Sequence, residues 1–218
     1  MDVTQIINAI AMATPGFLLA ICGRYSGQAY VASLFGDDTA ERSGRLSFNP
    51  AAHFDLVGTL IFPLFGIVIG GIPFGWGQQI PKDTRRFTKM KQGMFWTGFA
   101  GPLANILIGF VSLVLYAFVA QLVSNAFELK MQILMVLDMA MKINLIFAVF
   151  HLLPFPPLDG AQMVSVFLNY EQARKFEELE RFTLVFFLIL WMTNIFSYIA
   201  MPVLLTAYLL RNFIAGLL

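Results

Sequence analysis

Residues 144–160 read NLIFAVFHLLPFPPLDG. Three prolines break an apolar run, and a single carboxylate, Asp159, follows directly. Proline removes a backbone donor and stops regular helix, which predicts a membrane helix interrupted at depth. Broken backbone at membrane depth is tolerated only inside protein or beside a water-filled cavity, and an ionisable residue there marks a candidate functional site. The alternative is a helix that ends at the membrane surface, with Asp159 capping the next helix.

The composition indicates an integral membrane protein. The chain has 218 residues, of which 58% are hydrophobic and 12% are charged. Soluble domains carry about 25% charged residues. The length suits one compact bundle, so we expect a single membrane domain over residues 1–218 with the lipid bilayer around it. The net charge of +1 argues against a nucleic-acid partner, and the single Cys22 excludes an internal disulfide. No cleavable signal peptide is expected, because the first apolar stretch lacks a basic leading region.

Apolar runs predict an α-helical polytopic fold. The expected long membrane helices cover residues 4–35, 94–123 and 131–153. Residues 56–72 are interrupted by proline and glycine and barely span a ~30 Å hydrocarbon core, so we expect a short or re-entrant element. Residues 182–218 are too long for one straight crossing, and Pro202 predicts either a kinked helix or two short ones.

Two smaller features add to this fold. Residues 45–48 alternate in polarity and predict a short strand, which we expect to pair with a second strand over residues 74–80. Gly98, Gly101 and Ala104 give the 94–123 helix a small-residue face suited to close helix packing.

Charge predicts the orientation in the membrane. Residues 82–91 form the strongest basic cluster, which we place in the cytoplasm by the positive-inside tendency, and the alternative is a contact with anionic lipid. The mixed-charge residues 160–181 should share that side, because a helical hairpin separates the two segments. Asp138 and Lys142, at i and i+4, are expected to neutralise each other on one helix face.

An ordered set of short motifs carries a family resemblance. The motifs are Gly36-Asp37-Asp38-Thr39-Ala40, Gly44-Arg45-Leu46, Asn49-Pro50 with His53 and Asp55, Phe74-Gly75-Trp76, Ala100-Gly101-Pro102-Leu103-Ala104-Asn105, and Asn144 with Pro154, Pro157, Leu158, Asp159 and Gly160. In this order they resemble the compact bacterial branch of the site-2 protease family, which are intramembrane zinc metalloproteases. The resemblance covers about residues 15–163. It implies a site-2-protease-like helical core, further helices over residues 164–218, and location in a bacterial inner membrane.

The resemblance also implies a metal site that this chain lacks. In the family the Asp at position 159 is the third zinc ligand, and an H-E-x-x-H motif on the first helix supplies two His ligands and the catalytic Glu. The matching place, about ten residues before Gly36, reads Arg24-Tyr25-Ser26-Gly27-Gln28. Both His ligands therefore align with Arg24 and Gln28, and the catalytic Glu aligns with Tyr25.

Residue chemistry then predicts loss of the family activity, intramembrane metalloendopeptidase. Zinc takes imidazole, thiolate or carboxylate ligands, whereas Arg24 has no lone pair to donate and Gln28 is a poor ligand. Tyr25 cannot act as the carboxylate base near neutral pH. We therefore expect no zinc cofactor and a catalytically inactive homologue, a pseudoprotease. It would bind or regulate a membrane partner, either a transmembrane peptide or a membrane protein.

Two other functions stay open. The chain is an active metalloprotease if His151, Asp159 and Cys22 form an unusual ligand set, or it is a small-solute channel or transporter built on the same core. The resemblance assigns substrate contacts to Asn105, Asn144 and His151. It also predicts a free strand edge that would accept an extended peptide by β-augmentation.

The sharpest expectation is an ion pair between Arg24 and Asp159. Positions 24 and 28 share one helix face by their i, i+4 spacing, and Asp159 should approach that face. Without metal, either charge alone in the membrane is costly, whereas a guanidinium fits a carboxylate with two parallel hydrogen bonds. Tyr25 and Gln28 are expected to add donors. The alternative is that the Arg24 side chain snorkels to the membrane surface.

Overall fold

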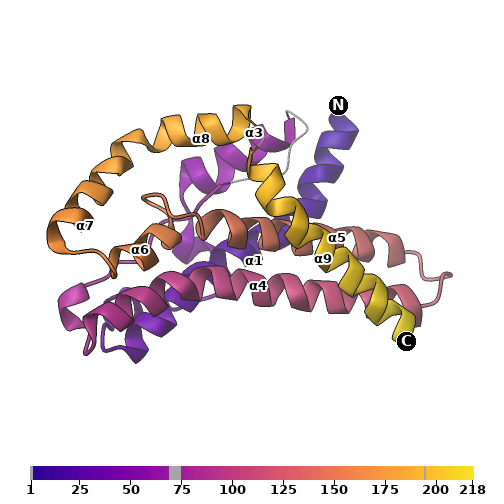
Figure 1. The fold of residues 1–218 in the computed structure, drawn as a ribbon. Helices are drawn as coiled ribbons and strands as arrows, with labels where there is room; N and C mark the ends of the chain where they lie inside the picture. The colour runs from indigo at the N-terminus through magenta and orange to yellow at the C-terminus, as the bar shows by residue number, and fades with distance from the viewer. Residues whose placement is uncertain (1, 69–74, 194) are drawn as a thin grey trace.

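The computed structural model describes residues 2–68, 75–193 and 195–218. In these ranges four helices are long and apolar enough to cross a membrane, namely α1 (Val3–Leu34), α4 (Met90–Leu122), α5 (Lys130–His151) and α9 (Ile195–Leu217). The chain is therefore a multi-pass α-helical membrane protein. Figure 1 shows α4 and α5 lying antiparallel along the length of the molecule, with α9 crossing them near one end.

Shorter elements fill the connections between these helices. They are α2 (Thr39–Arg42), η1 (Pro50–His53), the π-helical turn η2 (Leu56–Ile61), α3 (Phe62–Val68), η3 (Thr84–Arg86), α6 (Asp159–Ser165), α7 (Tyr170–Glu177), η4 (Glu178–Phe182) and α8 (Thr183–Met192). The η2–α3 unit covers 56–68, about 20 Å at helical rise, which is too short to cross the hydrocarbon core. This agrees with the expected short element, and residues 69–72 lie outside the described residues.

Small residues bring the three central helices together. A Cβ atom added at Gly16 of α1 would lie 2.5 Å from Cα of Ala140 of α5, and one added at Gly27 would lie 3.2 Å from the carbonyl oxygen of Ala100 of α4. Such close backbone approach is how membrane helices gain packing energy where the hydrophobic effect is weak. The small-residue face expected on α4 is therefore used, and it receives α1 and α6.

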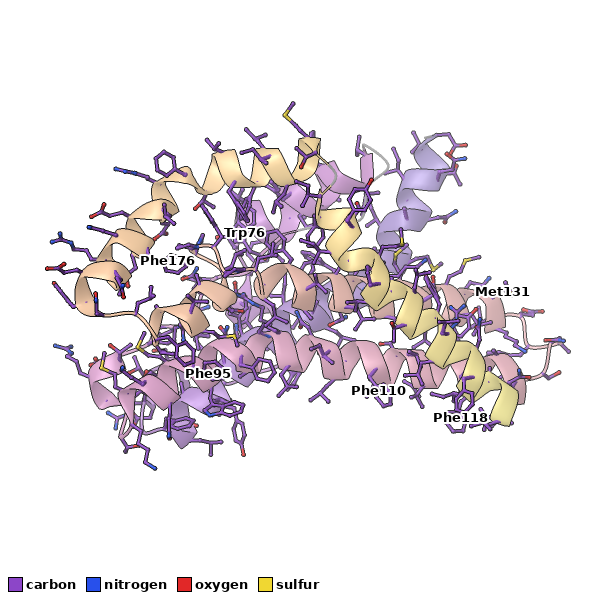
Figure 2. The ribbon with its side chains drawn as sticks, in the orientation of Figure 1. Trp76, Phe95, Phe110, Phe118, Met131 and Phe176 are labelled. Atoms are coloured by element: carbon purple, nitrogen blue, oxygen red, sulfur yellow. The ribbon has the colours of Figure 1, made fainter. Side chains whose placement is uncertain are left out.

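The outer surface of the bundle is apolar. Figure 2 shows Phe110 and Phe118 projecting outward from α4, and these residues are 46% and 42% exposed. Exposed aromatic residues along a long apolar helix are suited to lipid tails rather than to water. The bilayer is therefore the environment of this surface.

The predicted strand pair was wrong. The described residues contain no strand, and residues 45–48 and 75–80 are irregular. Phe74, the first residue of the second predicted strand, lies outside the described residues. With no strand over residues 45–48, the strand edge expected to receive an extended peptide is also absent there.

Local hydrogen bonding explains this result. The Trp76 amide donates to the Gly58 carbonyl at 3.0 Å, and the Gln78 amide donates to the His53 carbonyl at 2.9 Å. A Cβ atom at Gly77 would lie 2.5 Å from the same His53 carbonyl oxygen. Residues 75–80 therefore pack against the η1–η2 connection, and glycine, which is unfavourable in strands, permits this contact.

The C-terminal region forms two helices, but the break is not at the proline. Helix α8 ends at Met192, where the Thr193 hydroxyl donates to the Ile189 carbonyl at 2.6 Å. Pro202 lies inside α9, which continues through it. Membrane helices tolerate proline because neighbouring groups satisfy the freed backbone carbonyl, so the proline does not define the helix end here.

Candidate functional site

The candidate site is formed where α1, α4 and α6 meet. Arg24 and Gln28 lie one turn apart on α1, and Asp159 is the first residue of α6. The Pro-rich segment that follows α5 turns the chain back toward α1. Asp159 therefore reaches α1 from a helix start that follows the break predicted from the sequence.

The Arg24 guanidinium donates two parallel hydrogen bonds to the Asp159 carboxylate. Its Nε atom lies 2.9 Å from Oδ2, and its Nη2 atom lies 2.9 Å from Oδ1. Gln28 adds a third donor, with Nε2 at 2.8 Å from Oδ1. The residues Arg24, Gln28 and Asp159 are 6%, 2% and 6% exposed, so the Arg24 side chain does not snorkel to the surface. Paired charges with several hydrogen bonds are the form in which ions persist in a low-dielectric interior.

The small face of α4 makes room for this cluster. A Cβ atom at Gly101 would lie 2.9 Å from Cγ of Arg24 and 3.0 Å from Oδ2 of Asp159. One at Gly98 would lie 3.2 Å from the Asp159 carbonyl oxygen. Sequence reasoning assigned these glycines to helix packing and missed that Gly101 also accommodates the charged side chains.

Tyr25 does not join the cluster at Asp159, contrary to expectation. Its hydroxyl donates to the Gly77 carbonyl at 2.6 Å, and its ring stacks on His53 with centroids 5.5 Å apart. The Arg24 guanidinium carbon lies 4.6 Å from the centre of the same ring. The reason is helical geometry, since position 25 points about 100° away from position 24. Tyr25 therefore supports the ion pair from the side and holds residues 75–80 on α1.

His53 is a buried imidazole that stacks on Tyr25. Its Nε2 atom lies 2.8 Å from the Ser47 carbonyl oxygen, whereas Nδ1 is buried with no partner among the described residues. Burial lowers the pKa of His53 below its usual 6.5, and the Arg45 charge acts in the same direction against the hydrogen bond to Ser47. The neutral form with the proton on Nε2 satisfies this arrangement.

The three residues expected to contact substrate are all buried in the bundle. Asn144 donates to the carbonyls of Gly16 at 3.1 Å and Ala140 at 2.8 Å, which ties α5 to α1. The Nδ1 atom of His151 lies 3.1 Å from the Phe147 carbonyl one turn earlier. Asn105 is fully buried, and neither atom of its amide has a partner among the described residues. Within the described ranges, Asn105 is therefore the residue of these three whose polar side-chain atoms are all unpaired.

Gln162 of α6 bonds to Lys82, the first lysine of the basic segment 82–91, and the sequence did not predict this contact. The Lys82 Nζ atom donates to Oε1 of Gln162 at 2.7 Å, and Gln162 donates in turn to the Met94 carbonyl at 2.6 Å. This chain of bonds connects the basic segment 82–91 to α6 and α4. The signal was weak, because a lysine in a basic cluster is usually solvated.

The donors around Asp159 do not suit a zinc ion. Both carboxylate oxygens already accept bonds from N–H groups of Arg24 and Gln28, and a guanidinium cannot coordinate metal. Cys22 belongs to α1 and His151 to α5, and across the described ranges no three His, Cys, Asp or Glu side chains gather closely enough to hold an ion. The residues present therefore fit an ion pair and not the metal that the resemblance implies.

Fold and site together define a polytopic membrane protein with a buried guanidinium–carboxylate pair at the start of a helix. The chain is 35% identical over 179 residues to "Putative zinc metalloprotease YwhC" of Bacillus subtilis, covering 81% of this chain and 78% of that protein. It is 25% identical over 185 residues to "Putative zinc metalloprotease Rip2" of Mycobacterium tuberculosis strain H37Rv, covering 85% and 68%. Rip2 of Mycolicibacterium smegmatis is 27% identical over 168 residues, covering 77% and 61%.

No family model matches the chain, and no solved structure matches it. The extent of the similarity to the Bacillus protein nevertheless shows the family. The chain belongs to the site-2-protease-like family of membrane proteins that includes these zinc metalloprotease homologues.

Proposed function

We propose that this chain is a pseudoprotease, a member of its family that has lost zinc and proteolysis and that binds or regulates a membrane partner. The observation that supports it is the bidentate bond from Arg24 to Asp159. In this proposal positions 24, 25 and 28 are those of the family motif, and the permanent charge of Arg24 takes the place of the metal cation beside Asp159. The location that goes with it is a bacterial inner membrane.

The proposed partner is a transmembrane peptide or a membrane protein. Asn105 supports this, because a buried amide with no partner in the described part of the chain is costly and would be satisfied by an extended backbone. The groove that would admit such a chain involves no strand edge over residues 45–48.

The decisive experiment restores the ligand set. The triple variant Arg24→His/Tyr25→Glu/Gln28→His should bind about one zinc per chain, since the two introduced histidines and Asp159 then supply three protein ligands. Elemental analysis of purified protein should find no stoichiometric zinc in the unaltered chain or in Arg24→His alone. Adding Asp159→Asn to the triple variant should abolish its zinc. Stoichiometric zinc in the unaltered chain would overturn the proposal.

A second measurement tests the partner site. If the path to Asp159 is kept, the triple variant should cleave a transmembrane peptide that the unaltered chain binds without cleaving. The quadruple variant with Asp159→Asn is the matched control, and it should bind but not cleave. Zinc binding by the triple variant without any peptide binding by either protein would contradict the partner role and leave the metal assignment intact.

A further inference from the structure

A second charged cluster lies away from the candidate site, toward the opposite end of α5. Asp138 and His151 lie about 20 Å apart along this helix. The Nη1 atom of Arg211, from α9, donates to Oδ1 of Asp138 at 2.8 Å. The Nζ atom of Lys142 lies 2.6 Å from Oδ2 of the same carboxylate. The expected Asp138–Lys142 pair is thus joined by a cation that sequence spacing did not reveal.

The cluster carries an excess of positive charge. The Asp138 carboxylate pairs with two cations, Arg211 and Lys142. The Arg211 side chain is only 17% exposed, and the Lys142 side chain is 29% exposed. The Nε atom of Arg211 is buried, and nothing in the described part of the chain bonds to it. A cation that is not neutralised within a membrane helix is costly and marks a functional place.

Two aromatic rings hold the Arg211 guanidinium. Its central carbon lies 4.3 Å from the ring centre of Tyr116 on α4 and 4.8 Å from that of Tyr208 on α9. Cation–π contacts of this kind orient the guanidinium plane without neutralising its charge. The guanidinium is therefore held in a fixed orientation, and the two rings leave its charge unneutralised.

An open cavity of about 320 Å³ adjoins the cluster. Arg211, Asp138, Tyr116 and Tyr208 line its polar part, and Met131, Leu134 and Met135 of α5 line its apolar part. Figure 2 shows Met131 at the end of α5 near the α4–α5 connection. A second hollow of about 440 Å³ adjoins Met135 and Asp138 on the side of Ala9 and Met12 in α1. The Arg211 guanidinium therefore lies beside apolar walls, and the Asp138 carboxylate in the same lining is neutralised by its bonds to Arg211 and Lys142.

We propose that this cluster binds the phosphate group of an anionic membrane lipid, with an acyl chain against the methionine-lined wall. Arginine and lysine are the side chains suited to phosphate, and Asp138 keeps them in place. Asp138 lies about 12 Å along α5 from its first residue, a depth that long cations and headgroups reach from the interface. The apolar walls favour a lipid over free phosphate. This site is separate from Asp159 and does not depend on the proposed function.

Lipid binding to the purified full chain tests the proposal. Native mass spectrometry should show retention of phosphatidylglycerol in preference to phosphatidylcholine. Lys142→Gln removes the excess charge and keeps the Arg211–Asp138 pair, so it should weaken phosphatidylglycerol binding about fivefold, the strength of one basic residue at an anionic surface. Arg211→Gln should weaken it further. Arg174→Gln, an exposed arginine on α7, is the matched control and should change nothing.

Asp138→Asn separates this proposal from a purely structural cluster. It raises the local positive charge, so anionic lipid should bind at least as tightly as to the unaltered chain, whereas a structural cluster predicts only lower stability. Equal retention of the two lipids, or unchanged phosphatidylglycerol binding in both Lys142→Gln and Arg211→Gln, would overturn the proposal. Inorganic phosphate that competes fully with phosphatidylglycerol at equal concentration would overturn the assignment to a lipid.

Discussion

The Arg24–Asp159 pair shows how two opposite charges are accommodated in a buried site. Both side chains are 7% exposed, and each alone would be an uncompensated charge inside the membrane. The pair links α1 to the first residue of α6, directly after the α5–α6 connection. Gln28 shares the carboxylate, so the site has three donors for two oxygens.

Removing one member of this pair should cost more than removing both. Arg24→Leu leaves Asp159 buried with only Gln28, and breaking a buried pair from one side costs about 3–5 kcal/mol. Arg24→Leu/Asp159→Leu replaces both charges by apolar groups and should recover most of that loss. Thermal unfolding in one detergent measures the two variants side by side. The double variant proving less stable than the single one would refute a stabilising pair.

His53 predicts a dependence of stability on pH. Its folded pKa lies below the unfolded value of 6.5, so the unfolded chain binds the proton more readily. The contribution of His53 is therefore fully present above pH 6.5 and is lost as the pH falls below it. His53→Gln should show a shallower loss of melting temperature between pH 7.5 and about 5.5 than the unaltered chain. Parallel curves for the two proteins would argue against this role.

At the scale of elements, Lys130 links the ends of α4 and α5. Its Nζ atom donates to the carbonyls of Ala120 and Val123 and to the side chain of Asn125, at 2.7–2.8 Å. The last carbonyls of a helix have no partner within it, and a cation near the C-terminus also favours the helix dipole. The residue is only 8% exposed, so this cap replaces water at the turn of the hairpin.

Lys130→Met should therefore weaken the hairpin. The lost bonds involve a charged donor, and such bonds contribute about 1.5–3 kcal/mol each. The melting temperature should fall clearly, whereas Lys175→Met on exposed α7 should leave it nearly unchanged. Similar shifts in both variants would show that Lys130 is not a specific cap.

At the scale of the whole molecule, the helical hairpin defines which segments share a side. Figure 1 shows η3, the start of α4, α6 and α7 at one end of the α4–α5 pair and the connection between these helices at the other. The positive-inside tendency then places residues 82–91 and 160–181 in the cytoplasm. The orientation is a prediction from charge, whereas the shared end is a feature of the fold.

Cysteine labelling tests this orientation. In a Cys22→Ala background, single cysteines at Lys89 and Glu178 should resist a membrane-impermeant thiol reagent in intact cells and react after permeabilisation. A cysteine at Ala126, in the α4–α5 connection, should react from outside. The three positions are exposed, so access depends on the side of the membrane. Labelling of Lys89→Cys or Glu178→Cys in intact cells would contradict the predicted orientation in the membrane.

The sequence by itself determined the elements that depend on local pattern. Long apolar runs predicted α1, α4 and α5 near their observed bounds, because only a helix satisfies its own backbone groups within lipid. The i, i+4 spacing of Arg24 and Gln28 placed both on one face, and the Pro-rich break placed Asp159 at a helix start. The free-energy cost of an unpaired charge within the membrane then predicted that Arg24 and Asp159 form an ion pair.

Only the tertiary structure decided what depends on contacts between distant segments. Residues 75–80 alternate poorly but still suggested a strand, and the carbonyls of His53 and Gly58 determined their actual bonding. The Tyr25 hydroxyl donates to the Gly77 carbonyl instead of to Asp159, and Arg211 donates to Asp138, which lies 73 residues away in the sequence. Pro202 did not end a helix. These outcomes follow from which donors, acceptors and small residues the packed bundle brings within a few ångströms, and sequence spacing does not report such distances.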